Sequence, residues 1–271
     1  MIASLDQGRL IYGRLRKLVD LTVTLAWRDI SSRYRGANLG LLWTVLNPLL
    51  MLAVYGLAFG YVFRAKWPGL ETSGDFVRLL FIGIAVHGFF SECLTRSPGA
   101  IASNPSFVKK VVFPLGVIPA VITLVAFFNF LAILLVFLLI QLVAGDGWSL
   151  HYLLLPAVLF PMLLMGLAMS YLLSFLGVYF KDINQIVPSL STVLLFMSSA
   201  IVPVSTLPPE HQRWFSLNPI TFYIDQSRMA LLWGQALDWQ GLLARTVIGF
   251  GCLMIAVYLF RRARKGFADV I

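Results

Sequence analysis

The chain has 271 residues, of which 59% are hydrophobic and only 12% are charged, whereas soluble domains are about 25% charged. A water-soluble protein of this length could not bury so much apolar surface in one or two cores. The composition therefore argues against a soluble enzyme and against a nucleic-acid-binding module, in spite of a formal net charge of +9. In so apolar a chain, excess Lys and Arg indicates membrane orientation.

The N-terminal region, 1–38, is predicted to be cytoplasmic and to contain an amphipathic helix over 14–30. Apolar residues recur there at spacings of three and four, and Trp27 suits the membrane interface. We expect this helix to lie flat on the membrane surface; the alternative is a solvated cytoplasmic helix. Residues 1–20 lack the apolar stretch of a cleavable signal peptide, so the first span is expected to act as the insertion signal.

Apolar stretches long enough to cross a bilayer as helices follow, since about 20 residues span a hydrocarbon core of about 30 Å. The sequence predicts an all-α integral membrane protein in which the transmembrane domain covers 39–260. Its six predicted transmembrane helices are 39–63, 76–93, 117–143, 152–180, 186–204 and 242–260.

The distribution of charge gives this topology an orientation. Six spans place both termini on one face, which also receives the loop after the second span and the turn after the fourth. That face holds 15 of the 21 Lys and Arg residues and six of the 12 acidic residues, so it carries the whole +9. By the positive-inside rule it is the cytoplasm, and the tail 261–271 is predicted to be cytoplasmic.

The loop after the second span is predicted to be a cytoplasmic coupling segment, 97–114. It contains three prolines, a short Ala-Ile-Ala centre and a Lys-Lys pair, and it has room for one short helix. We interpret it as a docking element for another subunit, although a simple tether is the alternative.

The stretch 205–234 is predicted to form two short helices that dip into the membrane from the outer face. Pro209 and Asn218-Pro219 are helix-start signals, and Gly234 is a stop signal. The second helix, 219–233, would be about 22 Å long and carries two charges, so it suits a re-entrant outer gate better than a span. The candidate gate residues are Glu210, Trp214, Phe222, Tyr223, Asp225 and Arg228. A simple Asp225–Arg228 pair, three residues apart, is the alternative.

The sequence shows no motif for intrinsic chemistry. There is no phosphate-binding loop and no Cys/His cluster, so we expect a transport protein with no cofactor and no metal of its own. Span interiors nearly free of charge argue against transport driven by an ion gradient. Residues at i+4 spacing in the first span are candidates for lining a channel, with lipid contact or core packing as the alternative: Trp43, Asn47, Tyr55 and Phe59.

Several short motifs occur in a recognisable order over residues 24–234. They are Arg28-Asp29-Ile30 with Arg33-Tyr34-Arg35, Leu39-Gly40-Leu41-Leu42-Trp43, Asn47-Pro48, Phe180-Lys181-Asp182-Ile183 with Gln185-Ile186, Leu207-Pro208, and Asn218-Pro219 followed by Arg228. In these the chain resembles the permease subunits of the ABC transporters that export polysaccharides and polyol phosphates, such as O-antigen, capsule and teichoic acid.

The resemblance implies a permease in the bacterial inner membrane that works with a second copy of itself and with two ATP-binding subunits, which hold the ATP and Mg. It implies a glycan substrate attached to a lipid carrier, commonly undecaprenyl diphosphate. Export of drugs or lipids and a membrane-embedded lipid- or sugar-modifying enzyme remain the alternative functions.

Two groups of site residues follow from this resemblance and from the charges. The candidates for docking the ATPase are Arg96, Ser97, Asn104, Lys109, Lys110, Lys181 and Asp182. The candidates for binding the lipid-linked diphosphate are Lys17, Arg33 and Arg35, because Arg suits bidentate phosphate contacts. For these three, positive-inside anchoring or contact with anionic lipids is the alternative.

Overall fold

The computed structural model describes residues 2–62, 73–108, 113–144 and 149–270, and the regular elements in this part of the chain are all helices. Five helical segments are long and apolar enough to cross a membrane. They are Gly40–Ala58, Gly74–Arg96, Val117–Leu142, Leu150–Tyr179 and Trp239–Ala263. They match the predicted first, second, third, fourth and sixth spans to within a few residues.

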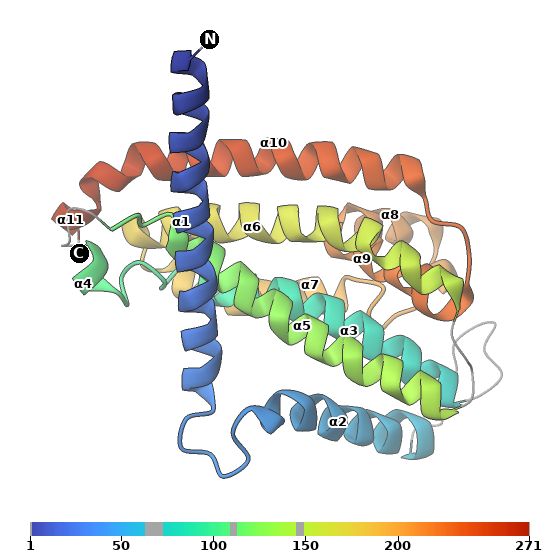
Figure 1. Cartoon of the computed structure of the whole chain (residues 1–271). Coiled ribbons are helices and arrows are strands. Elements are labelled where there is room, and N and C mark those ends of the chain that lie inside the picture. The colour runs from blue at the N-terminus through green and yellow to red at the C-terminus, as the bar shows by residue number, and fades with distance from the viewer. Residues whose placement is uncertain (1, 63–72, 109–112, 145–148, 271) are drawn as a thin grey trace.

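The long helices form a bundle with two distinct ends (Figure 1). Helices α3 (Ser73–Arg96), α6 (Leu155–Tyr179) and α10 (Trp239–Ala263) finish at one end, where α4 (Pro105–Val108) and α11 (Phe267–Val270) also lie. We call this end the basic end, because it carries Arg96, Lys181 and Arg261. The other end, where these three helices begin, is called the far end.

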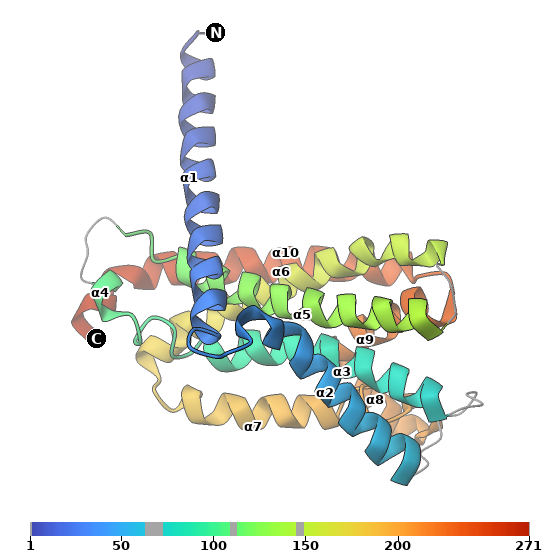
Figure 2. The same ribbon diagram turned by 60° about the horizontal axis from the view of Figure 1, so that its bottom comes forward.

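Helix α1 (Ile2–Arg33) is longer than the predicted N-terminal helix and crosses the bundle near its basic end (Figures 1 and 2). Ala26 and Ile30 are buried against Val125 of α5 (Val117–Ala144). Where the side chains of α1 are described, four apolar residues are more than half exposed: Leu15, Val19, Val23 and Trp27. The apolar stripe expected from the sequence is therefore divided between a protein contact and an uncovered surface.

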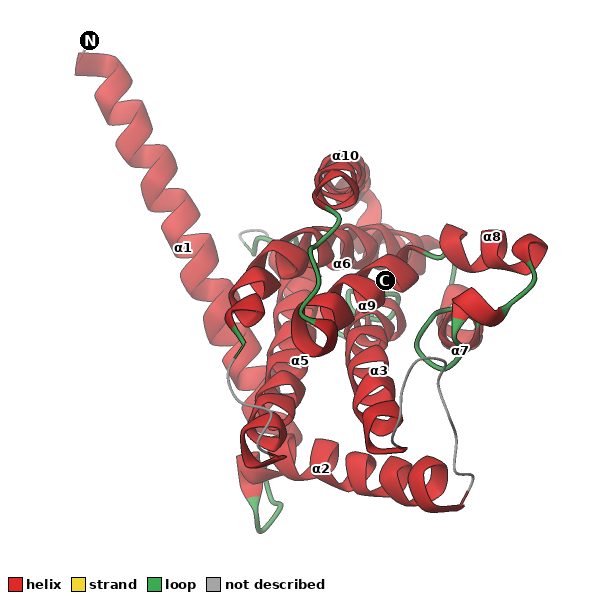
Figure 3. Cartoon of the chain, turned by 90° about the vertical axis from the view of Figure 1, so that its right-hand side faces the viewer, coloured by secondary structure: helices red, strands yellow, loops and turns green. Residues whose placement is uncertain are grey.

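Helix α3 is the centre of the molecule (Figure 3). It contacts α5, α6, α7 (Ile183–Phe196) and α9 (Pro219–Arg228), and 72% of its most apolar stretch is buried. Its inward side supplies Val86, Phe89 and Phe90 to the main core, where they meet residues such as Met162 of α6. Helix α3 therefore packs against the elements that form both ends of the bundle.

Two other helices are exposed along most of their length. Helix α2 (Trp43–Tyr55), extended by the short helix η1 (Gly40–Leu42) and the π-helix η2 (Gly56–Val62), is only 6% buried over its most apolar stretch. For α10, which packs mainly on α6, the buried share is 17%. The face of α10 turned away from α6 is apolar, with Leu243, Val247, Phe250 and Met254 all exposed. Such surfaces require lipid or another protein chain to cover them.

Helix α7 covers only part of the predicted fifth span, 186–204. Helix α7 ends at Phe196 and has 14 residues, which is about 21 Å. The side-chain amide of Asn218 donates to the carbonyl oxygens of Leu194 at 2.8 Å and Met197 at 3.0 Å. These bonds satisfy carbonyls at the end of α7, and residues 197–202 continue as turns and bends.

The predicted pair of short helices is present at the far end (Figures 1 and 3). Helix α8 comprises Pro209–Leu217, and α9 continues into the π-helix η5 (Met229–Trp233), which stops at Gly234 with a φ of 56°. Both start signals and the stop signal are confirmed. The remaining short elements are η3 (Leu150–Leu154), η4 (Val204–Thr206) and η6 (Arg264–Gly266).

Candidate functional site

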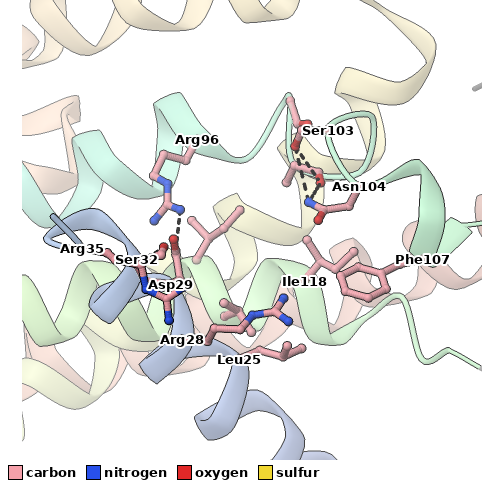
Figure 4. Close-up of a pocket in the computed structure, with 14 residues that line it drawn as sticks. Leu25, Arg28, Asp29, Ser32, Arg35, Arg96, Ser103, Asn104, Phe107 and Ile118 are labelled. Carbon is pink, nitrogen blue, oxygen red and sulfur yellow. Dashed lines mark hydrogen bonds and ion pairs between the residues drawn. The ribbon is translucent and has the colours of Figure 1, made fainter.

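A cavity of about 540 Å³ opens at the basic end, between α1, the 97–108 segment and α5 (Figure 4). This volume lies within the range of about 300–1,000 Å³ that small-molecule sites occupy. The residues that carry its polar character are Arg28, Asp29, Ser32, Arg35, Arg96, Ser103 and Asn104. The cavity joins two features that the sequence predicted separately, the amphipathic helix and the coupling segment.

An ion-pair network fixes α1 at this site. Arg96, at the end of α3, donates to Asp29 of α1 at 2.5 Å and to Glu92 at 3.1 Å. Glu92 also pairs with Arg33 of α1, and its other oxygen accepts from the Asn129 side chain of α5 at 2.7 Å. The network therefore ties α1, α3 and α5 together, and its partial burial makes it stronger than an exposed surface pair.

Two arginines at the cavity have no part in this network. Among the described residues, the guanidinium groups of Arg28 and Arg35 have neither an ion pair nor a hydrogen bond. Asp29 is the one acidic side chain among the lining residues described, and Arg96 neutralises it. The cavity thus has an excess of two positive charges and suits a phosphate or carboxylate ligand.

The structure separates the residues predicted to bind the diphosphate. Arg35 lines the cavity, but Arg33 is occupied by Glu92. Lys17 lies 16 positions before Arg33 on the same helix, about 24 Å along its axis, so the expected cluster of three is not formed. Arg28 also lines the cavity, although the sequence places it only in the Arg28-Asp29-Ile30 motif and not among the predicted site residues. Its position relative to α5 depends on how α1 packs.

The 97–108 segment is held by a buried anchor and by a close approach to α6. Ile101 is fully buried among Leu115, Val178 and Phe267. Gly177 of α6 lies directly against the backbone of Pro98, where a Cβ atom would overlap the Pro98 carbonyl. The segment is mostly a series of turns, and the expected short helix is reduced to the four residues of α4.

The residues predicted to dock the ATPase have different surroundings. Ser97 is fully buried and donates to the carbonyl of Cys93 at 2.5 Å, so its side chain faces away from any partner at this surface. Asn104 is half-buried and donates to the carbonyl of Ala100 at 2.9 Å, and Arg96 belongs to the ion-pair network. Lys181 and Asp182 are exposed, while Lys109 and Lys110 lie outside the described residues.

The turn after α6 lies beside the 97–108 segment. A Cβ atom at Gly99 would be 3.2 Å from the side-chain oxygen of Asn184, two residues after Asp182. Two stretches predicted to contact the same partner are therefore adjacent, although about 80 residues separate them in the sequence.

At the far end, a buried arginine holds α9 in place. The Arg228 side chain is fully buried and donates to the carbonyl of Leu79 at 2.9 and 3.2 Å. It also donates to the carbonyls of Ser199 at 2.6 Å and Ala200 at 3.1 Å. The ion pair with Asp225 that the sequence allowed is present at 3.8 Å. Arg228 thus joins α9 to α3 and to the turn after α7.

The other outer-gate candidates divide between the surface and the core. Glu210 is exposed, and so is Trp214, with 61% of the residue surface accessible. Tyr223 is fully buried and donates to the carbonyl of Pro161 at 3.3 Å. Phe222 is half-buried beneath the Arg245 guanidinium, 4.0 Å from the ring centre. Tyr223 and Arg228 therefore face the interior of this chain and not an exit path.

Two of the four channel candidates, Asn47 and Tyr55, lie on the side of α2 that faces α3. Asn47 and Tyr55 border an apolar cavity of about 190 Å³ together with Met51, Phe81 and Ile84. Trp43 is half-buried but does not line this cavity, and nothing is described for the Phe59 side chain. A role of these residues in a channel stays a prediction.

Comparison with known proteins gives consistent matches. Residues 20–232 match the family described as ABC-2 type transporter. The chain is 30% identical to the O-antigen export system permease protein RfbA of Myxococcus xanthus over 253 residues, 93% of this chain and 95% of the relative. It is 27% identical to a protein of the same name from Klebsiella pneumoniae, covering 94% and 96%. With the polysialic acid transport protein KpsM of Escherichia coli the identity is 25%, covering 86% and 90%.

Proposed function

The chain belongs to the ABC-2 type transporter family, and on that premise we propose that it is the channel-forming permease subunit of an ATP-driven exporter that moves a lipid-linked polysaccharide across the bacterial inner membrane. The observation that carries this proposal is the coverage of the match: relatives named for O-antigen export and polysialic acid transport align over most of both chains. Drug or lipid export and a membrane-embedded enzyme have no comparable support.

In this proposal the basic end faces the cytoplasm and the chain crosses the membrane six times. Five crossings are the long apolar segments, and α7 with the turns after it supplies the sixth. Both termini are then cytoplasmic, and α1 lies along the inner membrane surface with its uncovered apolar residues toward lipid. The helices α8 and α9 enter from the outer side and return to it, and protein contacts surround α9.

A thiol-labelling experiment tests this topology. We expect single cysteines at Glu210→Cys and Gln235→Cys both to react with an impermeant reagent from the outer side, because the second helix is too short and too charged to cross. Cys252 is exposed and Cys93 is buried, so the background needs Cys252→Ser. Labelling of position 235 from the cytoplasm alone would show that the segment spans and that the six-crossing model is wrong.

We assign the partner contacts to the two ends of this model. An ATP-binding subunit docks on the 97–108 segment and the adjacent turn at Lys181-Asp182, and two such subunits serve a pair of permeases. The second copy of this chain covers part of the apolar surface of α2 and α7. The described face of α2 is almost entirely open, which supports an additional protein neighbour there.

Reconstitution in proteoliposomes with the ATP-binding partner tests the proposed function. We expect a lipid-linked polysaccharide to stimulate ATP hydrolysis and to become accessible on the opposite side of the membrane. A partner with its phosphate-binding lysine replaced should abolish both signals. Stimulation by drugs with no response to the glycan would instead identify a drug exporter, and substrate turnover by the purified permease alone would identify an enzyme.

The positively charged cavity is assigned to the phosphate groups of the lipid carrier. Combined Arg28→Gln and Arg35→Gln substitutions are expected to raise the glycan-lipid concentration for half-maximal ATPase stimulation about tenfold, since charge-assisted hydrogen bonds are lost. Complex assembly should be unchanged, because neither arginine pairs with any residue that the structure describes. Arg16→Gln, an exposed change on α1 outside the cavity, is the matched control. An unchanged half-maximal concentration would refute the assignment.

A further inference from the structure

A second polar cavity lies at the far end, where the proposed function places the exit of the glycan. Its volume is about 500 Å³, and it is bordered by the start of α3, the end of α5, η3 and η5. The polar and aromatic side chains that concern the argument are Asp75, Arg78, Gln141, His151, Tyr152 and Trp233. In a chain that is 59% hydrophobic, such a concentration of polar groups in one cavity requires an explanation.

The charges of the cavity compensate one another. Arg78 pairs with Asp75 at 2.5 Å and donates to the side-chain oxygen of Gln141 at 2.8 Å. Asp75 and Arg78 are the only Asp, Glu, Lys or Arg side chains in the described lining, so their formal charges cancel. The cavity at the basic end, by contrast, has an excess of two. The far-end cavity therefore favours an uncharged ligand with several hydroxyl groups over a phosphate.

Gln141 supplies an unused donor. The residue is only 4% exposed, and it lies near the end of the apolar helix α5. The oxygen of its amide accepts from Arg78, which orients the group, but the amide nitrogen has no hydrogen-bond partner among the described residues. Gln141 lines the cavity, and its amide nitrogen is not among the fully enclosed polar atoms that lack a partner, so this N–H₂ group is open to an acceptor from a ligand or from water.

Aromatic surface borders the same cavity. Trp233 ends η5 and is 37% exposed, and Tyr152 of η3 also lines the cavity. Gly234 follows Trp233 in the left-handed region, and a Cβ atom there would lie 3.4 Å from the His151 ring. A sugar ring has an apolar C–H face and a polar edge. A flat aromatic side chain can pack on the C–H face, and the groups beside it can bind the hydroxyls at the edge.

We infer that the far-end cavity is a saccharide-binding site that holds one sugar ring of the exported glycan as the chain emerges. This inference rests on the proposed function for the origin of the sugar, but the binding itself is a property of the permease. The Gln141 amide and the Arg78–Asp75 pair select hydroxyl groups, and Trp233 stacks on the ring. Each permease carries its own copy of the site, within a single chain.

Saturation-transfer NMR on the permease–ATPase complex in nanodiscs tests the inference, with methyl glycosides of common hexoses and N-acetylhexosamines as probes. We expect at least one glycoside to bind the unmodified complex. Gln141→Glu, which keeps the acceptor for Arg78 but removes the N–H₂ donor, and Trp233→Ala should each weaken binding about tenfold. Trp239→Ala, an exposed tryptophan at the same end outside the cavity, is the control and should leave binding within about twofold.

The outcomes separate this inference from the proposed function. The saccharide site would be overturned if no glycoside bound, or if binding were unchanged in both variants. An equal loss of binding in Trp239→Ala, or displacement of the sugar by inorganic phosphate, would also overturn it. Glycan-stimulated ATP hydrolysis would then still stand. The complex could instead bind sugar in a way that depends on Gln141 and Trp233, while its ATP hydrolysis does not respond to lipid-linked glycan. This result would support the saccharide site and refute the proposed exporter function. Thermal unfolding of each variant confirms that it is folded.

Discussion

Replacing Arg228 with methionine is expected to abolish export by detaching α9 from the centre of the bundle. The side chain is fully buried and donates to three backbone carbonyls, from Leu79, Ser199 and Ala200. Its loss leaves these acceptors without their side-chain donor. The Leu79 carbonyl lies within α3 and keeps its helical partner, but the carbonyls of Ser199 and Ala200 lie in turns. Since an unsatisfied buried group costs about 1–3 kcal/mol, we expect a loss of at least about 2 kcal/mol in the free energy of unfolding. Thermal unfolding of the purified protein and glycan export measure the two effects.

Two further variants make this prediction specific. Arg228→Lys should fail to restore stability, because a single ammonium group cannot reproduce the planar set of donors. Gly83→Ala should act in the same direction, because its Cβ would lie 2.8 Å from the Arg228 guanidinium and from the Cα of Ala200. Arg213→Met, on the exposed side of α8, is the control. A stable and active Arg228→Met protein would show that α9 is held by other contacts.

Gly177→Val is expected to uncouple the permease from its ATPase while leaving the membrane helices folded. A Cβ atom at position 177 would overlap the Pro98 carbonyl and lie 2.6 Å from the Pro98 Cα. Backbone atoms cannot move aside as a flexible side chain does, so the 97–108 segment must shift away from α6. Because that segment is the proposed docking surface, copurification of the ATPase and glycan-stimulated ATP hydrolysis should both fall at least about tenfold.

The matched control is Gly251→Val in α10. It introduces the same side chain into a long apolar helix, but no heavy atom lies within 4 Å of its Cβ position. We expect this variant to bind the ATPase as the unmodified chain does. Normal ATPase binding by Gly177→Val, with an unchanged thermal unfolding temperature, would place the docking surface elsewhere.

The sequence alone determined the features that depend on neighbouring residues. Apolar runs of about 20 residues predicted five long helices. Any helix of sufficient length and hydrophobicity is stable in a bilayer, whichever residues it packs against. The start signals at Pro209 and at Asn218-Pro219 placed α8 and α9 correctly, because capping is settled within one turn. The motifs shared with polysaccharide exporters pointed to the family that the comparisons established.

Tertiary structure decided which residues meet. The end of α7 depends on the Asn218 side chain 24 residues beyond Leu194. The ion pair of Arg33 depends on Glu92, 59 positions away. The burial of Ser97, Tyr223 and Arg228 could not be recognised from their spacing. In a soluble helix the apolar face marks the core, but lipid and protein interiors are equally apolar. Hydrophobic periodicity in this chain therefore identifies helices without telling which face packs on protein, and only the fold assigns the inward and outward sides.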